Sequence, residues 1–276
     1  MGYKKPTEVS RAHLEAALLP THGKTYAVVS HKFVIESTIK LLQQSNFIIK
    51  NSIYRANKSC NVAQGVIYIE PMNNNPIFDG EDDLSMMFAW TNSYDKTTRF
   101  QCAIGAYVDV CSNGMICGEM SFARKHTGTA KQEIYAQITN QIMSAEKTFI
   151  DIIRDKDQLK NTPLNLKNQS ELLGRLYCDE ELLEPSHLSV IKTEMKKASY
   201  DYGVDKENAW AFYNHVTHAL KKTHPRTWMN DSKNFHDFMT TEFNNSSPQS
   251  QQDNAVVGTL DMLNIDIDEM VDPIEI

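Results

Sequence analysis

The sequence has little of what marks secreted, membrane-embedded or well-known catalytic proteins. Its apolar runs are only a few residues long, far below the roughly 20 needed to cross a bilayer, so we expect no membrane partner. The five cysteines form no Cys-x-x-Cys pair and no apolar signal segment precedes them, so we expect free thiols and a cytoplasmic location. The phosphate-binding loop, the dinucleotide-binding glycine pattern and the Gly-x-Ser-x-Gly turn are all missing. These absences favour a binding protein over an enzyme, and we expect no cofactor.

Basic residues are missing from the C-terminal segment. From Ser247 to Ile276 there are seven acidic residues and no lysine or arginine, whereas the whole chain has 28 basic and 35 acidic residues. The rest of the chain is therefore formally neutral, with 28 of each sign. A polar Ser/Gln/Asn run joins the two parts and offers no apolar period, so we expect residues 246–276 to be a disordered acidic tail.

The last residues of this tail, DIDEMVDPIEI, are similar to the acidic, apolar-tipped C-terminal peptide of bacterial single-stranded-DNA-binding proteins. Such a peptide can compete with phosphates for cations of the folded body, or it can dock on a basic groove of a host or phage protein. The residues we expect to carry that contact are Asp266, Asp268, Glu269, Asp272, Ile274 and Ile276.

The sequence before the tail predicts a strand-rich half followed by a helical half. Runs rich in β-branched and aromatic residues predict a short strand at 26–29 and longer strands at 47–55, 62–70, 84–90, 99–108 and 115–122. After about residue 130 the apolar period becomes helical, which predicts one long helix over 130–157 and further helices at 169–183, 186–197, 206–222 and from Pro225 onward. We therefore predict an α+β fold, in which an antiparallel sheet within 25–126 is covered by helices of 130–245 as one domain, with residues 1–24 as an N-terminal arm.

Alternation along two strands predicts which side chains face outward. In the first long strand Phe47, Ile49 and Ile53 should face the core, leaving Lys50 and Tyr54 on the other side. In the later strand the residues from Phe100 to Val108 alternate in the same way and direct Arg99 and Tyr107 outward. Cations interleaved with aromatic rings on a sheet face are typical of nucleic-acid binding, although a solvated face has the same composition. The nucleic-acid-binding candidates are Lys50, Tyr54, Arg55, Lys58, Arg99, Tyr107, Arg124, Lys125 and His126.

Three short stretches and one helix carry a family resemblance. The stretches are NSYDK at 92–96, VCSNGM at 110–115 and ARKHTG at 123–128, and the helix is WAFYNHVTHAL at 210–220. Together they resemble an uncharacterised family of phage- and plasmid-encoded proteins, over roughly residues 26–218. The resemblance implies a mobile-element setting in a bacterial cytoplasm and singles out Asn92, Ser93, Asp95, Cys111, Asn113, His126, Thr127, Trp210, Asn214 and Thr217.

Ordinary structural roles compete with each motif. Asn92, Ser93 and Asp95 are also turn-forming residues between two strands. Lone cysteines and histidines at these spacings lack the paired ligands of a structural zinc site, so we expect no metal. The sequence leaves open whether His215 and His218, three residues apart on a helix, bind one.

Three functions are compatible with these patterns. The leading hypothesis is a non-enzymatic DNA-metabolism accessory of a mobile element that binds single-stranded DNA or a recombination intermediate on its sheet. An alternative is a protein-binding antagonist of a host defence system that acts through acidic surface and tail. A third is an enzyme acting on a nucleotide, which needs Asp95, Cys111 and His126 in one pocket. Self-association as a homo-oligomer is left open.

Overall fold

The protein is described by a computed structural model over residues 7–20, 28–72, 81, 83–111, 113–117, 120–122 and 129–244. Several sequence predictions fall outside these residues. They are the acidic tail, the segment that holds Arg124, Lys125, His126 and Thr127, and the first half of the strand expected at 26–29.

Within the described residues seven strands form one antiparallel sheet, in the spatial order β1-β2-β3-β4-β5-β6, with β7 paired to the start of β5. Neighbours in this order are mostly neighbours in the sequence, as expected for strands joined by short turns. The predicted antiparallel sheet is confirmed. The strands are β1 (Thr7–Val9), β2 (Phe47–Ala56), β3 (Val62–Pro71), β4 (Leu84–Ser93), β5 (Gln101–Val108), β6 (Asn113–Ile116) and β7 (Ser121–Phe122).

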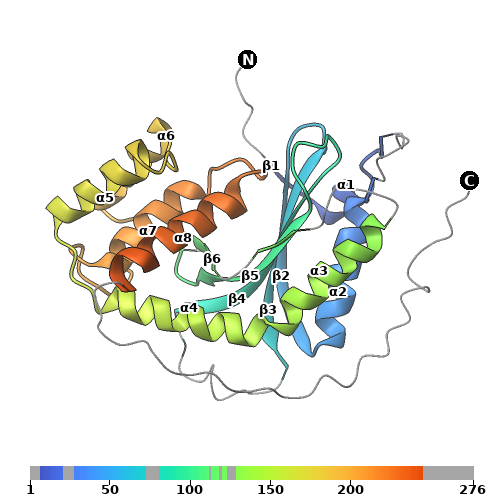
Figure 1. Ribbon diagram of the computed structural model, residues 1–276, viewed down its shortest axis with the longest axis horizontal. Helices are drawn as coiled ribbons and strands as arrows, with labels where there is room; N and C mark the ends of the chain where they lie inside the picture. Colours follow the sequence, from blue (N-terminus) through green and yellow to red (C-terminus); the bar gives the residue numbers. More distant parts are fainter. Residues whose placement is uncertain are drawn as a thin grey trace, which may run out of the picture.

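Helices occupy most of the described chain after β7. Figure 1 shows the sheet between α2 and α3 on one side and α7 and α8 on the other, with α4 running along one end. The predicted α+β arrangement, with a strand-rich half followed by a helical half, is therefore confirmed. The helices are α1 (Arg11–Glu15), α2 (His31–Gln44), α3 (Ala130–Met143), α4 (Ala145–Lys160), α5 (Leu166–Cys178), α6 (Pro185–Lys196), α7 (Ala209–Leu220) and α8 (Trp228–Asn244).

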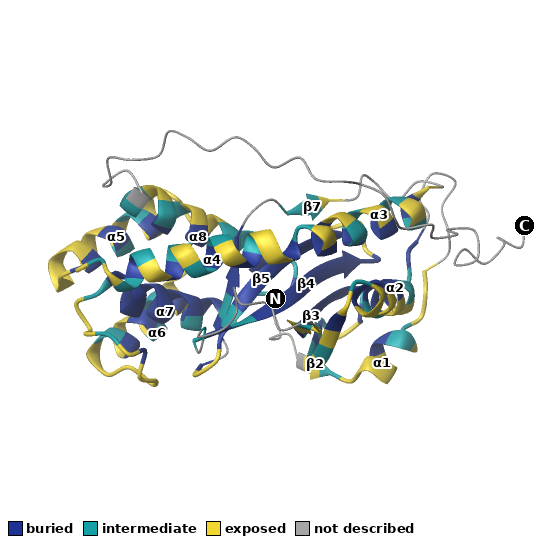
Figure 2. Cartoon of the chain, turned by 90° about the horizontal axis from the view of Figure 1, so that it is seen from below, coloured by how far each residue is buried: buried dark blue, intermediate teal, exposed yellow. Residues whose placement is uncertain are grey.

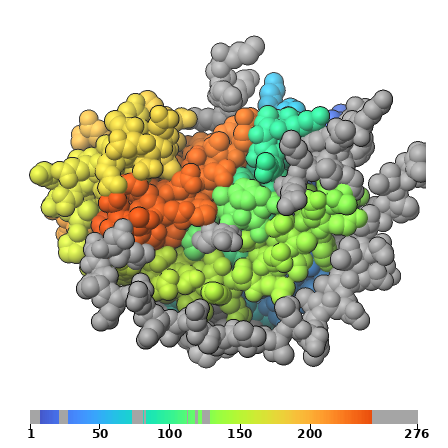
Figure 3. Space-filling model, in the orientation of Figure 1, coloured from blue at the N-terminus to red at the C-terminus, as the bar shows by residue number. Residues whose placement is uncertain are grey.

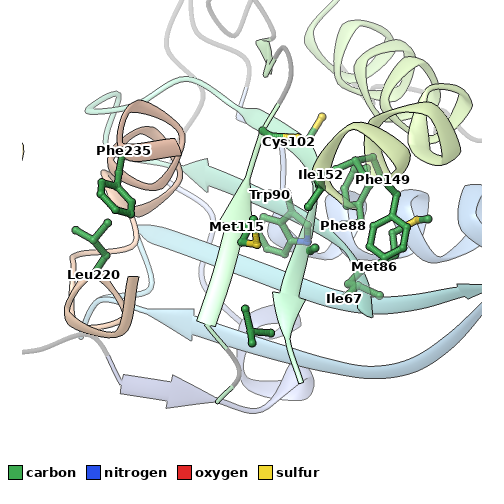
Figure 4. Close-up of a cluster of buried hydrophobic side chains, with 14 of the residues drawn as sticks. Ile67, Met86, Phe88, Trp90, Cys102, Met115, Phe149, Ile152, Leu220 and Phe235 are labelled. Carbon is green, nitrogen blue, oxygen red and sulfur yellow. The ribbon is translucent and has the colours of Figure 1, made fainter. Parts of the chain in front are cut away.

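One face of the sheet, which we call the core face, carries the main hydrophobic core. Ile67, Phe88 and Ile104 lie opposite one another across β3, β4 and β5, and all three are fully buried. Phe149 and Ile152 of α4 belong to the same cluster, and Figure 4 shows them beside Phe88. Burying side chains of this size stabilises the fold by about 1.5–3 kcal/mol each. Figure 2 shows the consequence, with dark-blue strands beneath helices whose outer sides are exposed.

The opposite face, which we call the second face, carries a smaller cluster. Val66, Met87, Ala89 and Ala103 point to this side and are buried beneath the start of α8, which brings Trp228 and Met229 into the same cluster. In Figure 3 the orange to red surface of α7 and α8 adjoins the green surface of the strands. The helical half therefore covers part of both faces of the sheet.

The single long helix predicted over 130–157 is wrong, because the structure has two helices that meet at Ser144. The backbone of Ser144 has φ −90° and ψ 1°, and its hydroxyl donates to the carbonyl of Gln141 at 3.1 Å. A serine side chain that bonds to nearby backbone in this way competes with the helical pattern. The break lets α3 pack on α2 and β7 while α4 continues to α7.

Two smaller differences concern the N-terminal part. Val28 and Val29, at the end of the strand predicted for 26–29, are buried but lie in no strand. In the segment expected to be an arm, β1 pairs with β2, and Glu8 lies opposite Arg55. The described part of this segment therefore extends the sheet.

Candidate functional site

Three of the predicted cations share one end of the sheet. Arg55 lies near the end of β2 on the second face, and Lys58 and Arg99 are exposed in the turns that precede β3 and β5. These two turns meet, since the amide of Tyr94 donates to the carbonyl of Asn61 at 2.6 Å. The structure therefore brings Arg55, Lys58 and Arg99 to the same end.

Lys50 and Tyr54 do not join them. Pairing between β2 and β3 shifts register between Ile49 and Asn51, so Lys50 occupies a bulge, where it forms an exposed ion pair with Glu70. Because one extra residue inverts the alternation that follows, Tyr54 points to the core face and is only 3% exposed. The prediction that Tyr54 faces outward is wrong for this reason. The inward assignment of Ile53 is wrong as well, since Ile53 lies on the second face.

The second face contains a cavity of about 390 Å³, which we call the second-face cavity. Its floor is apolar and comes from adjacent strands, with Ile53 of β2 opposite Val66 of β3, and Met87 of β4 beside them. This volume lies within the range of about 300–1,000 Å³ found for small-molecule sites.

Aromatic rings form two walls of the second-face cavity. Tyr68 and Tyr107 stand edge to face with centroids 4.3 Å apart, and burial raises the pKa of both phenols, to about 12 for Tyr68, so both hydroxyls stay neutral. The indole of Trp228 at the start of α8 is the other wall. Gly114 makes room for it, because a Cβ there would lie 2.7 Å from Trp228 Cζ2.

Polar side chains line the end of the cavity nearest the β2–β3 turn. Arg55 and Gln64 lie opposite each other on β2 and β3, and Glu8 of β1 pairs with Arg55 from the other side. The guanidinium of Arg55 donates one hydrogen bond, to the carbonyl of Thr223 at 3.2 Å. Burial lowers the pKa of Arg55, and the Glu8 carboxylate opposes that shift. An arginine nonetheless stays charged in proteins, so this end of the cavity carries a partly buried positive group.

A second cation enters the cavity from the helical half. Lys221, which follows α7, lines the cavity and donates its ammonium to the carbonyl of Cys111. Its Nζ also lies 5.8 Å from the ring centroid of Tyr200. Burial lowers the pKa of Lys221, and the Glu194 carboxylate partly offsets that shift. With Arg55, Lys221 and Glu8, the charged side chains described around the cavity sum to one positive charge.

Residues of the family resemblance form a buried network beside Lys221. The amide of Asn113 donates to the Oδ1 and the backbone carbonyl of Asn214 at 3.1 and 3.0 Å, and the Cys111 thiol lies 3.8 Å from that Oδ1. Asn214 in turn donates to the carbonyl of Trp210, and Thr217 donates to that of Tyr213. The contacts of Cys111 and Asn113 with Asn214 connect β6 and the turn before it to α7 and so hold the helix against the sheet, whereas the bonds to Trp210 and Tyr213 lie within α7.

A second group of motif residues lies at the other end of β4. Asn92 donates to the carbonyl of Val29 at 3.0 Å and contacts Nδ1 of His31 at 3.1 Å. The His31 ring stacks on Tyr94 with centroids 4.0 Å apart, and its Nε2 is 2.8 Å from the carbonyl of Cys60. This group anchors the start of α2 to the β2–β3 turn and to the end of β4.

The remaining motif residues of the β4–β5 turn bond locally. The hydroxyl of Ser93 donates to the carbonyl of Thr98 at 2.8 Å, and the Asp95 carboxylate accepts from the amide of Thr97 at 3.0 Å. Such bonds are the turn chemistry that competes with a ligand role for these residues.

Asp95 and Cys111 are not in one pocket. Asp95 precedes β5 and Cys111 follows it, so eight strand residues separate them, or about 26 Å at 3.3 Å per residue. Burial also raises the pKa of the Cys111 thiol, which keeps it protonated and a poor nucleophile. His126, the third member of that enzymatic hypothesis, lies outside the described residues.

His215 and His218 lie in a polar cluster with Glu194. The Glu194 carboxylate accepts from the amide and hydroxyl of Ser199 at 2.9 and 2.6 Å, and His218 Nε2 is 4.0 Å away. Burial lowers the pKa of both histidines, to about 4 for His215. Over the part of the chain that the structure describes, no three His, Cys, Asp or Glu side chains are grouped so that they could hold a metal ion.

Several residues of the second-face cavity were missed by sequence reasoning. Gln64, Val66 and Tyr68 alternate along β3, so the period of two could have placed them on one face. Lys221 and Trp228 come from the helical half, more than 100 residues further along the chain, and no local pattern connects them to the sheet.

Comparisons with known proteins give one match. The family model described as a domain of unknown function, DUF932, matches residues 19–254. No curated protein and no solved structure matches the chain. Separately, none of the helices described here is both long and apolar enough to cross a membrane.

Proposed function

The chain belongs to the DUF932 family of domains of unknown function, and we propose that it binds single-stranded DNA on the second face of its sheet. We propose this as a non-enzymatic role in the DNA metabolism of a phage or plasmid, carried out in the cytoplasm of the bacterial host.

The second-face cavity is the observation that carries this proposal. It combines the rings of Tyr68, Tyr107 and Trp228 with the partly buried cations Arg55 and Lys221 over an apolar floor. Aromatic rings bind bases by stacking, at about 1–3 kcal/mol per base, and cations neutralise the phosphates of the strand. A single strand offers unstacked bases and flexible phosphates, so it can present both to such a cavity at once.

The exposed cations near the cavity support a path for the rest of the strand. Lys58 and Arg99 lie in the two turns at the Arg55 end, where their side chains face solvent. Bases held in the cavity would place neighbouring phosphates near this end. The salt dependence of DNA binding should then contain contributions from all three cations, Arg55, Lys58 and Arg99.

Fluorescence anisotropy with a labelled deoxyoligonucleotide at two salt concentrations tests the proposal. Arg55→Gln keeps a donor for the Thr223 carbonyl but removes the charge, so it should weaken binding. It should also reduce the salt slope by about 0.7 for each phosphate that is no longer neutralised. Tyr107→Leu should weaken binding at both salt concentrations, because stacking is not screened.

Two surface changes on α5 serve as matched controls. Lys167→Gln removes the same charge from a side chain that is 83% exposed, and Tyr177→Leu removes an exposed ring. Neither should change binding. Absence of oligonucleotide binding by the unaltered protein, or equal losses in the α5 controls, would refute the proposed function.

A further inference from the structure

Gln64 has a buried carboxamide for which the described residues offer no hydrogen-bond partner. The residue is 1% exposed, and neither its Nε2 nor its Oε1 bonds to any residue that the structure describes. The buried carboxamide of Gln141, by contrast, accepts from the amide of Ile104 at 3.0 Å and donates to Ser121 at 2.9 Å. A buried polar group without a hydrogen-bond partner destabilises the folded protein. The contacts of the free protein therefore do not explain why a glutamine occupies this position.

The position of Gln64 supplies that reason. It lies on the wall of the second-face cavity, opposite Arg55 on the neighbouring strand and two residues from the apolar floor at Val66. Tyr68 is on the same face of β3, four residues further along, so a ring between them would meet the carboxamide at its edge and aromatic groups on its other sides.

We infer that the second-face cavity takes a single unstacked nucleobase and that the Gln64 carboxamide reads its edge. A glutamine amide pairs with adenine through two hydrogen bonds, accepting from N6 and donating to N7. The ligand is therefore an adenine nucleotide unit, with its phosphate near Arg55 and Lys221. This inference rests on the proposed function, because it states which part of a single strand enters the cavity.

The test compares adenine-containing and thymine-containing homopolymers with the unaltered protein and with Gln64→Leu. The unaltered protein should prefer the adenine strand by roughly 5- to 150-fold, the range that corresponds to one bidentate base contact. Gln64→Leu should remove this preference while weaker binding to both strands remains. Equal affinity for the two strands, or a preference that survives Gln64→Leu, would overturn the inference and leave the proposed function standing.

Thermal unfolding of the free protein distinguishes a ligand-binding role of Gln64 from a structural role. Leucine is close to glutamine in size and has no polar group to leave unpaired, so Gln64→Leu should keep or raise the melting temperature in the absence of DNA. A lowered melting temperature would show that Gln64 supports the fold and would also overturn the inference.

Calorimetry with deoxyadenosine monophosphate separates this inference from the proposed function. Binding of the mononucleotide that disappears in Gln64→Leu would support the inference even if no oligonucleotide binds, in which case only the proposed function would fail. Failure of both the mononucleotide and the oligonucleotides to bind would overturn both.

Discussion

His31 is held in one protonation state by the groups on its two ring nitrogens. A carbonyl, that of Cys60, faces Nε2, and an amide donor, that of Asn92, faces Nδ1. A carbonyl only accepts, so Nε2 must carry the proton and Nδ1 must accept from Asn92. A second proton, on Nδ1, would point at the Asn92 amide, which is itself a donor, so the protonated ring is disfavoured. Burial acts in the same direction and lowers the pKa of His31 to about 4, against a smaller opposing effect of the Cys60 bond.

This arrangement predicts a loss of stability in acid. Because the folded pKa is near 4 and the ordinary value is 6.5, the unfolded chain binds the extra proton first as the pH falls. The stabilising contribution of His31 is thus complete above pH 6.5 and decreases as the pH falls toward 4, by up to about 3 kcal/mol. His31→Gln keeps one donor and one acceptor without titrating, so the free energy of unfolding in urea should depend less steeply on pH in this variant. An unchanged pH dependence in His31→Gln, with the surface variant His13→Gln as the control, would contradict the assignment.

At the scale of single elements, the loop before β4 is tied to α4 by a buried ion pair. Lys156 Nζ lies 2.9 and 2.7 Å from the two carboxylate oxygens of Glu81, and the two side chains are 7% and 6% exposed. Glu81 also accepts from the amides of Asp83 and Leu84, both at 3.1 Å. One carboxylate therefore fixes the start of β4 and neutralises a buried ammonium.

Removal of one partner should be costly. Glu81→Ala leaves the ammonium of Lys156 buried with only Asp83 and Asp157 nearby among the described carboxylates, at 3.6 and 3.3 Å, so we expect the free energy of unfolding to fall by about 3 kcal/mol. The double change Glu81→Leu with Lys156→Met should recover most of that loss, because it leaves no buried charge. Urea unfolding measures both. A loss no larger than that of Lys32→Met, which breaks an exposed pair on α2, would show that Glu81 and Lys156 are not coupled.

The elements differ in how far the sequence could predict them. Strands β2 to β5 have strong periods, and the structure has them close to their expected positions. The alternation after Lys50 could not be predicted, because a bulge is decided by pairing with β3 and leaves no mark in β2 itself. The break at Ser144 was missed for a related reason, since the apolar period of α3 continues almost in phase into α4. The cavity was missed because its walls come from both halves of the chain.

At the scale of the whole molecule, charge is divided unevenly between the body and its C-terminal segment. Residues 247–276 carry seven acidic residues and no basic ones, and their removal changes the formal net charge from −7 to 0. If the body binds DNA, this segment is a tethered competitor for its cations, at an effective concentration on the order of mM.

Deletion of residues 247–276 should therefore tighten binding of single-stranded DNA and reduce its dependence on added salt, without loss of the folded body. Anisotropy titrations and thermal unfolding of the shortened and full chains measure both effects. A partner-docking role predicts a different result, in which DNA affinity is unchanged and capture of the partner requires Ile274 and Ile276. A shortened chain that no longer folds would contradict both roles.

The second-face cavity also has a consequence for biosynthesis. Its floor is complete once β5 has left the ribosome, but Lys221 and Trp228 follow more than 100 residues later. During that interval Val66, Met87, Ala89 and Ala103 have no helix to cover them, and exposed apolar strands of this kind are prone to aggregate. The nascent chain should thus depend on chaperones until α8 emerges, and a message truncated before residue 228 should yield an insoluble product even though all seven described strands of the sheet have been made.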